Sequence, residues 1–135
     1  MIFIGLFKAI WWLIKLPFGQ NKKRKVITQA DRNFIIQKKQ EIENLLESNN
    51  KIDLIHALIE SDKTVDHIFK LNGYPGESFA DRLRFAEKKI DQRIYNRLWQ
   101  AHKIRNQVVH ETDHNISNQE IKNATAILIQ YLKNV

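Results

Sequence analysis

The stretch Ile52–Leu71, IDLIHALIESDKTVDHIFKL, decides the fold class of this chain. Its apolar residues recur at spacings of three and four and do not alternate, which is the period of an amphipathic α-helix. Asn72-Gly73 follows directly and is typical of a helix C-cap, because glycine adopts a left-handed backbone conformation at little cost. We therefore predict a helix here, with an apolar arc formed by Ile52, Ile55, Leu58, Ile59, Val65 and Phe69.

The helical period continues on both sides of this stretch. We predict a first helix over about Ala30–Ser48, with Phe34, Ile35, Ile42, Leu45 and Leu46 on its inner side, and a turn at Asn49-Asn50. Later helices are expected over Ser78 to about Ile90, about Gln92–Glu111 and about Asn118–Lys133, the middle one either separate from its predecessor or continuous with it. Ser78 with Asp81 and Ser117 with Glu120 have the spacing of capping pairs.

Composition supports one helical domain. The 135 residues are enough for a single domain, and four Gly and two Pro are too few for a sandwich or barrel of many short strands. There is no Cys, which excludes disulfides, thiolate zinc sites and a cysteine nucleophile. We predict that residues 26–135 form an all-α bundle of four to five helices, preceded by a hydrophobic N-terminal helix within residues 1–25, and we expect no cofactor.

The N-terminal segment has the character of a membrane-associating helix. Met1–Phe18 is apolar except for Lys8 and Lys15, and an interfacial helix is favoured because Trp11 and Trp12 lie near its middle, not at its ends. A spanning helix and a helix buried against the body or a partner remain alternatives. An anionic membrane surface is the expected partner, with the body on the cytoplasmic side by the positive-inside rule. The residues expected to contact the membrane are Lys8, Trp11, Trp12, Lys15, Lys22, Lys23, Arg24 and Lys25.

The positive charge of the chain is concentrated in that segment. Of the 22 Lys and Arg residues, six lie in residues 1–25 together with none of the 15 Asp and Glu. The body therefore carries 16 basic against 15 acidic residues, and its formal net charge is only +1. A net charge this small is weak evidence that the body binds nucleic acid by general attraction to the phosphate backbone.

Two predicted helices carry charges within their apolar arcs. Asp62 and Asp66 lie in the arc of the helix over Ile52–Leu71, and Arg105 lies near the centre of the arc of the helix that follows Gln92, with Arg97 nearer its rim. A buried unpaired charge costs several kcal/mol. We therefore expect Asp62 or Asp66 to pair with Arg105 or Arg97, either as an architectural ion pair or as part of a site. The arc itself consists of Ile94, Leu98, Ala101, Ile104, Val108 and Val109.

A polar stripe follows the same helix as Arg105. His102, Asn106 and His110 are spaced four apart and share one face, flanked by Tyr95 and Trp99. The two histidines lie about 12 Å apart along the helix axis, too far to share one metal ion, so no metal site is predicted. A histidine that exchanges protons near neutral pH beside an arginine suits proton transfer at a phosphodiester.

Arg105-Asn106-Gln107-Val108-Val109-His110 resembles the R-x(4–6)-H motif of HEPN domains, in which the residue after the arginine is often Asn, Asp or His. The resemblance covers roughly residues 26–135 and is strongest over Leu98–Leu132. It implies a helical bundle that commonly forms a homodimer, with the motifs of two subunits meeting in one cleft. Many HEPN proteins are metal-independent ribonucleases, often toxins or antiviral effectors, and a toxin would have a cognate antitoxin as its partner.

The resemblance also implies roles for individual residues. His110 would be the acid–base residue, Arg105 would bind the scissile phosphate, and Asn106 would orient that phosphate or His110. The ribose 2′-OH would attack, leaving a cyclic phosphate and a 5′-OH. The charged and polar positions described above, independent of the resemblance, add His102, Asp62 and Asp66 as candidate supporting residues. HEPN domains also include non-catalytic members. The sequence thus leans toward a membrane-tethered endoribonuclease acting on RNA, with a non-catalytic interaction module at the membrane as the alternative.

Overall fold

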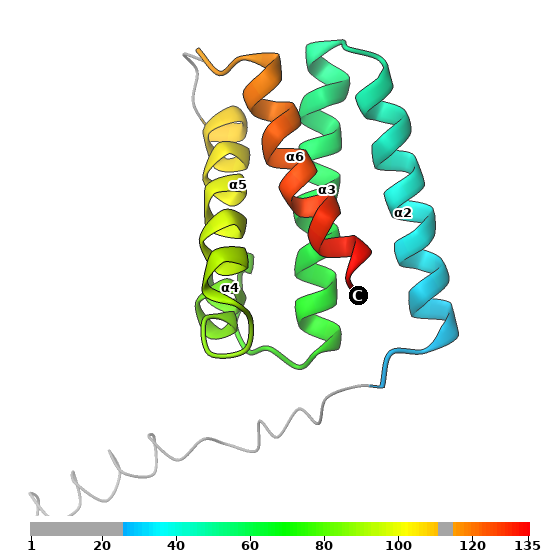
Figure 1. The fold of residues 1–135 in the computed structure, drawn as a ribbon, viewed down its shortest axis with the longest axis vertical. Helices are drawn as coiled ribbons and strands as arrows, with labels where there is room; N and C mark the ends of the chain where they lie inside the picture. Colours follow the sequence, from blue (N-terminus) through cyan, green and yellow to red (C-terminus); the bar gives the residue numbers. More distant parts are fainter. Residues whose placement is uncertain (1–25, 111–114) are drawn as a thin grey trace, which may run out of the picture.

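The computed structural model describes residues 26–110 and 115–135, in which five helices are joined by short loops and there is no strand. The helices are α2 (Gln29–Glu47), α3 (Lys51–Leu71), α4 (Phe79–Ala86), α5 (Gln92–His110) and α6 (Asn118–Lys133) (Figure 1). The predicted all-α bundle is confirmed at this level. The predicted N-terminal helix lies outside the described residues. None of the described helices is both long and apolar enough to cross a bilayer.

Helix α3 is the centre of the bundle and packs against each of the other four helices. Helices α2 and α6 lie along it, α5 lies on the far side of α6 from α2, and the short α4 covers the lower ends of α3 and α5 (Figure 1). The central position of α3 explains its composition, because its buried residues include Leu54, Leu58, Val65 and Phe69. The helix that decides the fold class is therefore also the one that organises the core.

Local capping fixes where the helices begin. Thr28 and Asp31 form a capping box at α2, and Ser117 and Glu120 form the predicted one at α6. The side chain of Ser78 accepts the backbone N–H of Asp81, as the sequence indicates for α4. At the other end of α3, Asn72 is the C-cap and Gly73 adopts a φ of 78°, the left-handed conformation expected there. These ends follow from single residues and their local hydrogen bonds.

The third predicted helix is shorter than expected and does not continue into the fourth. Helix α4 ends at Ala86, and the backbone N–H groups of Lys89 and Ile90 both donate to the Ala86 carbonyl in a tight turn. Asp91 then begins α5, because its carboxylate accepts the backbone N–H of Arg93 at 2.9 Å. A side chain that accepts from the first turn acts as an N-cap, so Asp91 separates the two helices.

The predicted core is correct along most of the bundle but wrong at several apolar positions. Ile52 is 76% exposed, and Phe34, Ile94 and Val109 are also exposed. Helix α3 is contacted by helices on several sides, so its buried surface is wider than the single apolar arc predicted from the sequence. The buried surface therefore includes residues outside that predicted arc. Those additional buried residues are Leu54, Ala57, Ile68 and Leu71.

Candidate functional site

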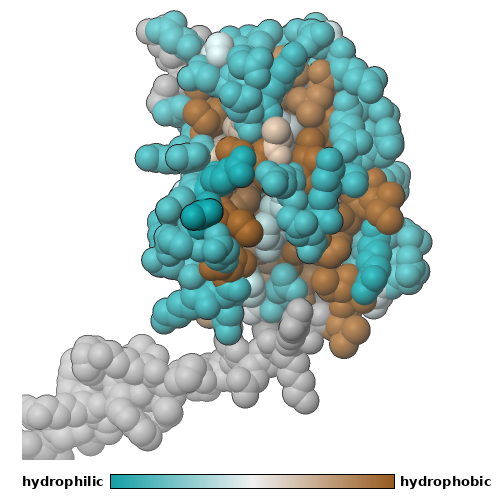
Figure 2. Space-filling model, viewed as in Figure 1, coloured by the Kyte–Doolittle hydropathy of each residue, from teal (hydrophilic) through white to brown (hydrophobic). Residues whose placement is uncertain are grey.

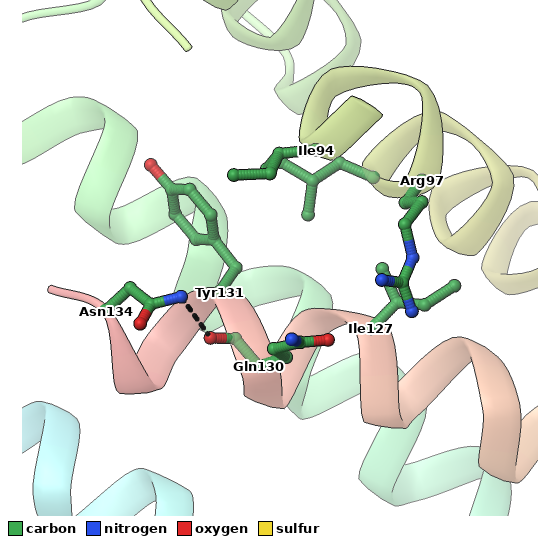
Figure 3. A pocket seen from close by; sticks show the side chains of 7 residues that line it. Ile94, Arg97, Ile127, Gln130, Tyr131 and Asn134 are labelled. Atoms are coloured by element: carbon green, nitrogen blue, oxygen red, sulfur yellow. Dashed lines mark hydrogen bonds between the residues drawn. The ribbon is translucent and has the colours of Figure 1, made fainter. Parts of the chain in front are cut away.

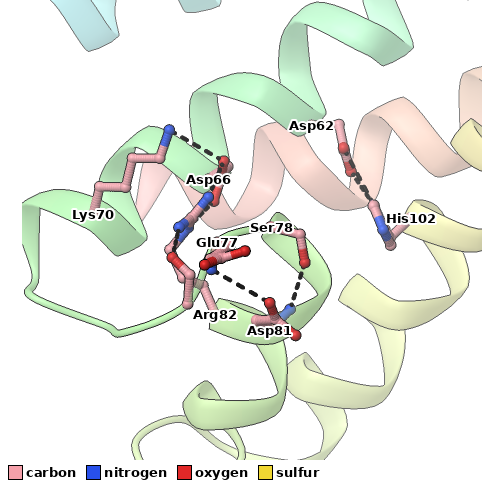
Figure 4. A network of polar contacts seen from close by, with 9 residues as sticks. Asp62, Asp66, Lys70, Glu77, Ser78, Asp81, Arg82 and His102 are labelled. Atoms are coloured by element: carbon pink, nitrogen blue, oxygen red, sulfur yellow. Dashed lines mark hydrogen bonds and ion pairs between the residues drawn. The ribbon is translucent and has the colours of Figure 1, made fainter.

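The most buried polar contact between helices joins Asp62 on α3 to His102 on α5. Asp62 is 4% exposed, and the Nδ1 atom of His102 lies 3.0 and 3.2 Å from its two carboxylate oxygens (Figure 4). Phe79 of α4 meets the imidazole edge-on, with ring centroids 4.8 Å apart, and Trp99 packs at 6.0 Å. The imidazole of His102 is thus held by packing as well as by its hydrogen bond.

Arg105 and Asn106 complete a ring of polar contacts with this pair. The Nδ2 of Asn106 lies 3.3 Å from the Nε2 of His102, and the Nη1 of Arg105 donates to the Oδ1 of Asn106 at 3.1 Å. The Nε of Arg105 lies 3.7 Å from the Oδ2 of Asp62, which returns the ring to its start. The predicted pairing of Asp62 with Arg105 is therefore confirmed as an ion pair.

The ring has a single consistent assignment of protons. Arg105 can only donate, so the oxygen of the Asn106 amide must face it and the amide nitrogen must face His102. The Nε2 of His102 then has to accept, which places the imidazole proton on Nδ1, where it is donated to Asp62. Asp62 thus fixes the tautomer of His102, which in turn fixes the orientation of Asn106.

Burial dominates the electrostatics of Asp62. Desolvation raises the pKa of this carboxyl above its ordinary value, while the hydrogen bond from His102 and the positive charge of Arg105 oppose the rise. The Nε of Arg105 is itself buried and makes no hydrogen bond. The attraction between Arg105 and Asp62 is therefore less complete than that of a hydrogen-bonded ion pair.

Asp66 is paired with Arg82, so of the two aspartates that the sequence offered to Arg105 the structure selects Asp62. The Nε and Nη2 of Arg82 donate to the two carboxylate oxygens of Asp66 at 2.5 and 3.0 Å, and its Nη1 donates to the Gly76 carbonyl at 2.5 Å (Figure 4). Arg82 is buried, and its hydrogen bonds with Asp66 raise its pKa. The short α4 brings this arginine to α3, closer to Asp66 than any side chain of α5.

Sequence reasoning missed Arg82, although a signal was present. Phe79, Leu83 and Ala86 form the buried face of α4, and Arg82 lies within that face. A charge within an apolar arc is the same pattern that drew attention to Asp62. Eight residues give too short an arc for that pattern to stand out.

Arg97 belongs to a different part of the surface. It is exposed and lines a small hollow of about 120 Å³ between α5 and α6, together with Ile94 and Tyr131 (Figure 3). Burial raises the pKa of Tyr131 to about 12, so its hydroxyl stays protonated at neutral pH. This hollow offers no group that exchanges a proton near neutrality.

Most of the predicted site residues meet in one polar pocket between α3, α4 and α5. The pocket has a volume of about 400 Å³, and its lining includes Asp62, Asp66, His102, Arg105 and Asn106, all from the predicted set. Arg82, Lys63 and Lys70 add positive charge to it. His110 does not line the pocket; it is exposed at the last residue of α5. The predicted membrane-contact residues lie outside the described residues.

The described residues contain no group of three or more His, Asp or Glu side chains placed to hold a metal ion. Comparison of the chain with models of protein families, with curated proteins and with solved structures gives no match in any of the three.

Proposed function

We propose that residues 26–135 form a HEPN-like domain that cleaves RNA without a metal ion, held at the cytoplasmic face of an anionic membrane by a hydrophobic helix within residues 1–25. The observation that supports it is the arrangement along α5. Arg105 and Asn106 line the polar pocket, and His110 is exposed one turn beyond Asn106. The residues that the R-N-x-x-x-H resemblance marks are therefore accessible to a substrate.

Arg105 has the chemistry of a phosphate-binding residue. Its side chain is 24% exposed, and Nη1 is held by Asn106. Among the described residues, Nη2 has no hydrogen-bond partner. A guanidinium held from one side with a free terminal nitrogen can donate to a phosphate oxygen and stabilise the charge that develops there. Asn106 acts in this proposal by holding Arg105 in place.

His110 supplies proton transfer in the proposed reaction. An imidazole removes the proton of the ribose 2′-OH as the 2′ oxygen attacks phosphorus, and an imidazolium protonates the departing 5′ oxygen. The products are a 2′,3′-cyclic phosphate and a 5′-OH. Arg105 and His110 are five residues apart, about 140° around the helix, so one chain does not direct both at one point. A homodimer, in which two α5 helices contribute, brings these groups together.

The test is RNA cleavage by the full chain in the presence of EDTA. We expect the wild-type protein to cleave, His110→Ala to lose at least about 100-fold in rate, and Arg105→Ala to lose activity as well. His56→Ala is the matched control, because His56 is an exposed histidine outside the polar pocket. Wild-type protein that leaves RNA intact, or His110→Ala that cleaves normally, would contradict the proposal.

The second candidate is a non-catalytic interaction module at the membrane. The ring of Asp62, His102, Asn106 and Arg105 favours it, since the ring gives Arg105 a structural role in the absence of substrate. Under this function the protein forms its dimer, or binds a partner such as a cognate antitoxin, without cleaving RNA. Cleavage distinguishes the two candidates, and analytical sedimentation of the same samples checks that the dimer has formed.

Membrane attachment has its own test, independent of cleavage. Lys and Arg near an anionic surface each contribute about 1 kcal/mol to binding, and salt screens the effect. The full chain should co-sediment with vesicles that contain phosphatidylserine, less so when Lys22–Lys25 are replaced by Gln, and least when Trp11 and Trp12 also become Ser. Equal sedimentation of all variants would refute attachment by this segment.

A further inference from the structure

A groove between the beginning of α2 and the end of α6 combines basic and apolar side chains. Its volume is about 330 Å³, and its lining includes Arg32, Lys39 and Lys133 together with Ile27, Ile36 and Val135. No acidic residue of the described chain lines it. In a body whose formal net charge is +1, three basic side chains with no acidic side chain among them are a local excess of positive side-chain charge.

The cations of this groove are free to meet an external anion. Within residues 26–110 and 115–135, none of Arg32, Lys39 and Lys133 forms an ion pair. The neighbouring Lys38, by contrast, is bound to Glu41 at 3.1 Å and lies 3.6 Å from Glu60. On α2, therefore, Arg32 and Lys39 carry no ion pair, whereas the adjacent Lys38 is paired with glutamates.

The same region exposes apolar side chains. Ile36 is 62% exposed, Val26 is 86% exposed, and Val135 is also exposed. Hydrophobic surface is visible over the lower half of α2, the half that contains the N-terminus of this helix (Figure 2). Apolar side chains surrounded by lysine and arginine are the composition of a surface that rests on an anionic bilayer.

We propose that this groove and its rim, defined by Val26, Ile27, Arg32, Ile36, Lys39, Lys133 and Val135, form the face of the body that contacts an anionic lipid surface. The proposal rests on the proposed attachment by residues 1–25 and adds an orientation to it. Lys25 precedes Val26, and a residue spans at most about 3.6 Å, so Ile27 lies within about 7 Å of the last basic residue of the segment. A membrane-bound segment therefore brings this groove, and not the opposite end of the bundle, to the lipid.

The absence of cysteine from the chain allows a direct test by single-site labelling. Ile36→Cys and Ile52→Cys each place an environment-sensitive fluorophore at an isoleucine that is exposed in the structure. Ile36 borders the groove, whereas Ile52 lies in the first turn of α3, at the end of the bundle away from the start of α2 (Figure 1). The two variants in the full chain are thus matched in chemistry and differ in position.

With vesicles of phosphatidylcholine and phosphatidylserine, we expect the emission of the label at position 36 to shift to the blue and that of the label at position 52 to stay unchanged. With phosphatidylcholine alone the shift at position 36 should be much smaller. Co-sedimentation measured on the same samples reports attachment separately. A chain that sediments without a shift at position 36, or with equal shifts at both positions, overturns the proposed face while leaving the attachment intact; a chain that does not sediment overturns both.

The charges of the groove give a second, independent readout. One kcal/mol corresponds to about fivefold in a binding constant, so Arg32→Gln, Lys39→Gln and Lys133→Gln together should weaken vesicle binding by up to about 100-fold. The matched control replaces Arg93, Lys88 and Lys103, one arginine and two lysines that are exposed and away from the groove, by Gln. If the control weakens binding equally, net charge and not this face governs the interaction, and the proposal fails.

Discussion

The two aspartates on the buried side of α3 are neutralised in different ways, and this difference predicts unequal effects of removing their arginines. Arg82 is buried and makes three hydrogen bonds, whereas the other cation at Asp66 is the exposed Lys70, 3.6 Å away. Arg82→Ala therefore removes the buried partner of Asp66 and should lower the free energy of unfolding by about 3 kcal/mol. Arg105 makes no hydrogen bond to Asp62. Without Arg105, the Asp62 carboxylate keeps its hydrogen bond from His102. Arg105→Ala should therefore cost only about 1–2 kcal/mol in urea unfolding.

The exposed Arg84 provides the control for that pair of variants. It forms an ion pair with Asp81 three residues away on the same helix, and such surface pairs contribute little. Arg84→Ala should change stability by no more than about 0.5 kcal/mol. If Arg105→Ala proved as destabilising as Arg82→Ala, the 3.7 Å contact of Arg105 would be stronger than its geometry indicates.

The raised pKa of Asp62 predicts a pH dependence of stability. An unfolded aspartate ionises with a pKa of about 4, whereas burial makes folded Asp62 hold its proton to higher pH. The folded state then binds more protons than the unfolded state, so this residue's contribution to stability falls as pH rises from about 4 through the raised pKa. Asp62→Asn should remove that slope, with Glu47→Gln at an exposed position as the control. Equal slopes for the wild type and Asp62→Asn would contradict the shift.

Sequence alone predicted part of this polar site. Asp62 and Arg105 could be identified because each places a charge within an otherwise apolar arc of a long helix. The partner of Asp66 could not be identified from sequence, because Arg82 reaches Asp66 only through the packing of α4 against α3. His102 was identified by its spacing from Asn106 and His110, but its role as the hydrogen-bond partner of Asp62 depends on the rotation of α5 about its axis. Those are tertiary facts that no local pattern encodes.

At the level of helices, the beginnings were predictable where a capping side chain marks them. The start of α6 was predicted at Asn118 because Ser117 and Glu120 form a capping box, and the structure confirms it. The end of α4 was not predicted, because Lys88 and Lys89 are compatible with a helix. Only the tight turn that follows Ala86 ends α4. Local hydrogen bonds to side chains leave a signal in sequence, whereas turns made by the backbone alone do not.

The capping box of α6 gives a prediction at this scale. Ser117→Ala removes the acceptor of the Glu120 backbone N–H and should lower the free energy of unfolding by about 1 kcal/mol. Gln119→Ala, two residues further along the exposed surface, should change stability by less than about 0.5 kcal/mol. Urea unfolding monitored by circular dichroism measures both. A neutral Ser117→Ala would mean that packing against α3 and α5, and not the cap, holds the first turn of α6.

At the scale of the whole molecule, the described helices share one buried apolar core. Helix α3 is surrounded by the other described helices, and the buried apolar cluster runs from Ile35 on α2 to Leu132 on α6. Helix α2 has its own N-cap at Thr28 and needs no preceding helix to begin. We therefore predict that a chain of residues 26–135 folds without the N-terminal segment. Its circular dichroism should be strongly helical, and its thermal unfolding cooperative, as expected of a single small domain.

A core substitution in the same shortened chain makes that prediction decisive. Leu128 is fully buried on α6, so Leu128→Ala should lower stability by about 2–5 kcal/mol if the core is packed as described. A molten body would respond weakly to this change, because loosely packed side chains leave no defined cavity. A non-cooperative melt together with a weak Leu128→Ala effect would indicate that the apolar residues of Met1–Phe18 belong to the core. In that case the segment would be buried against the body, and this would also count against its binding to a membrane.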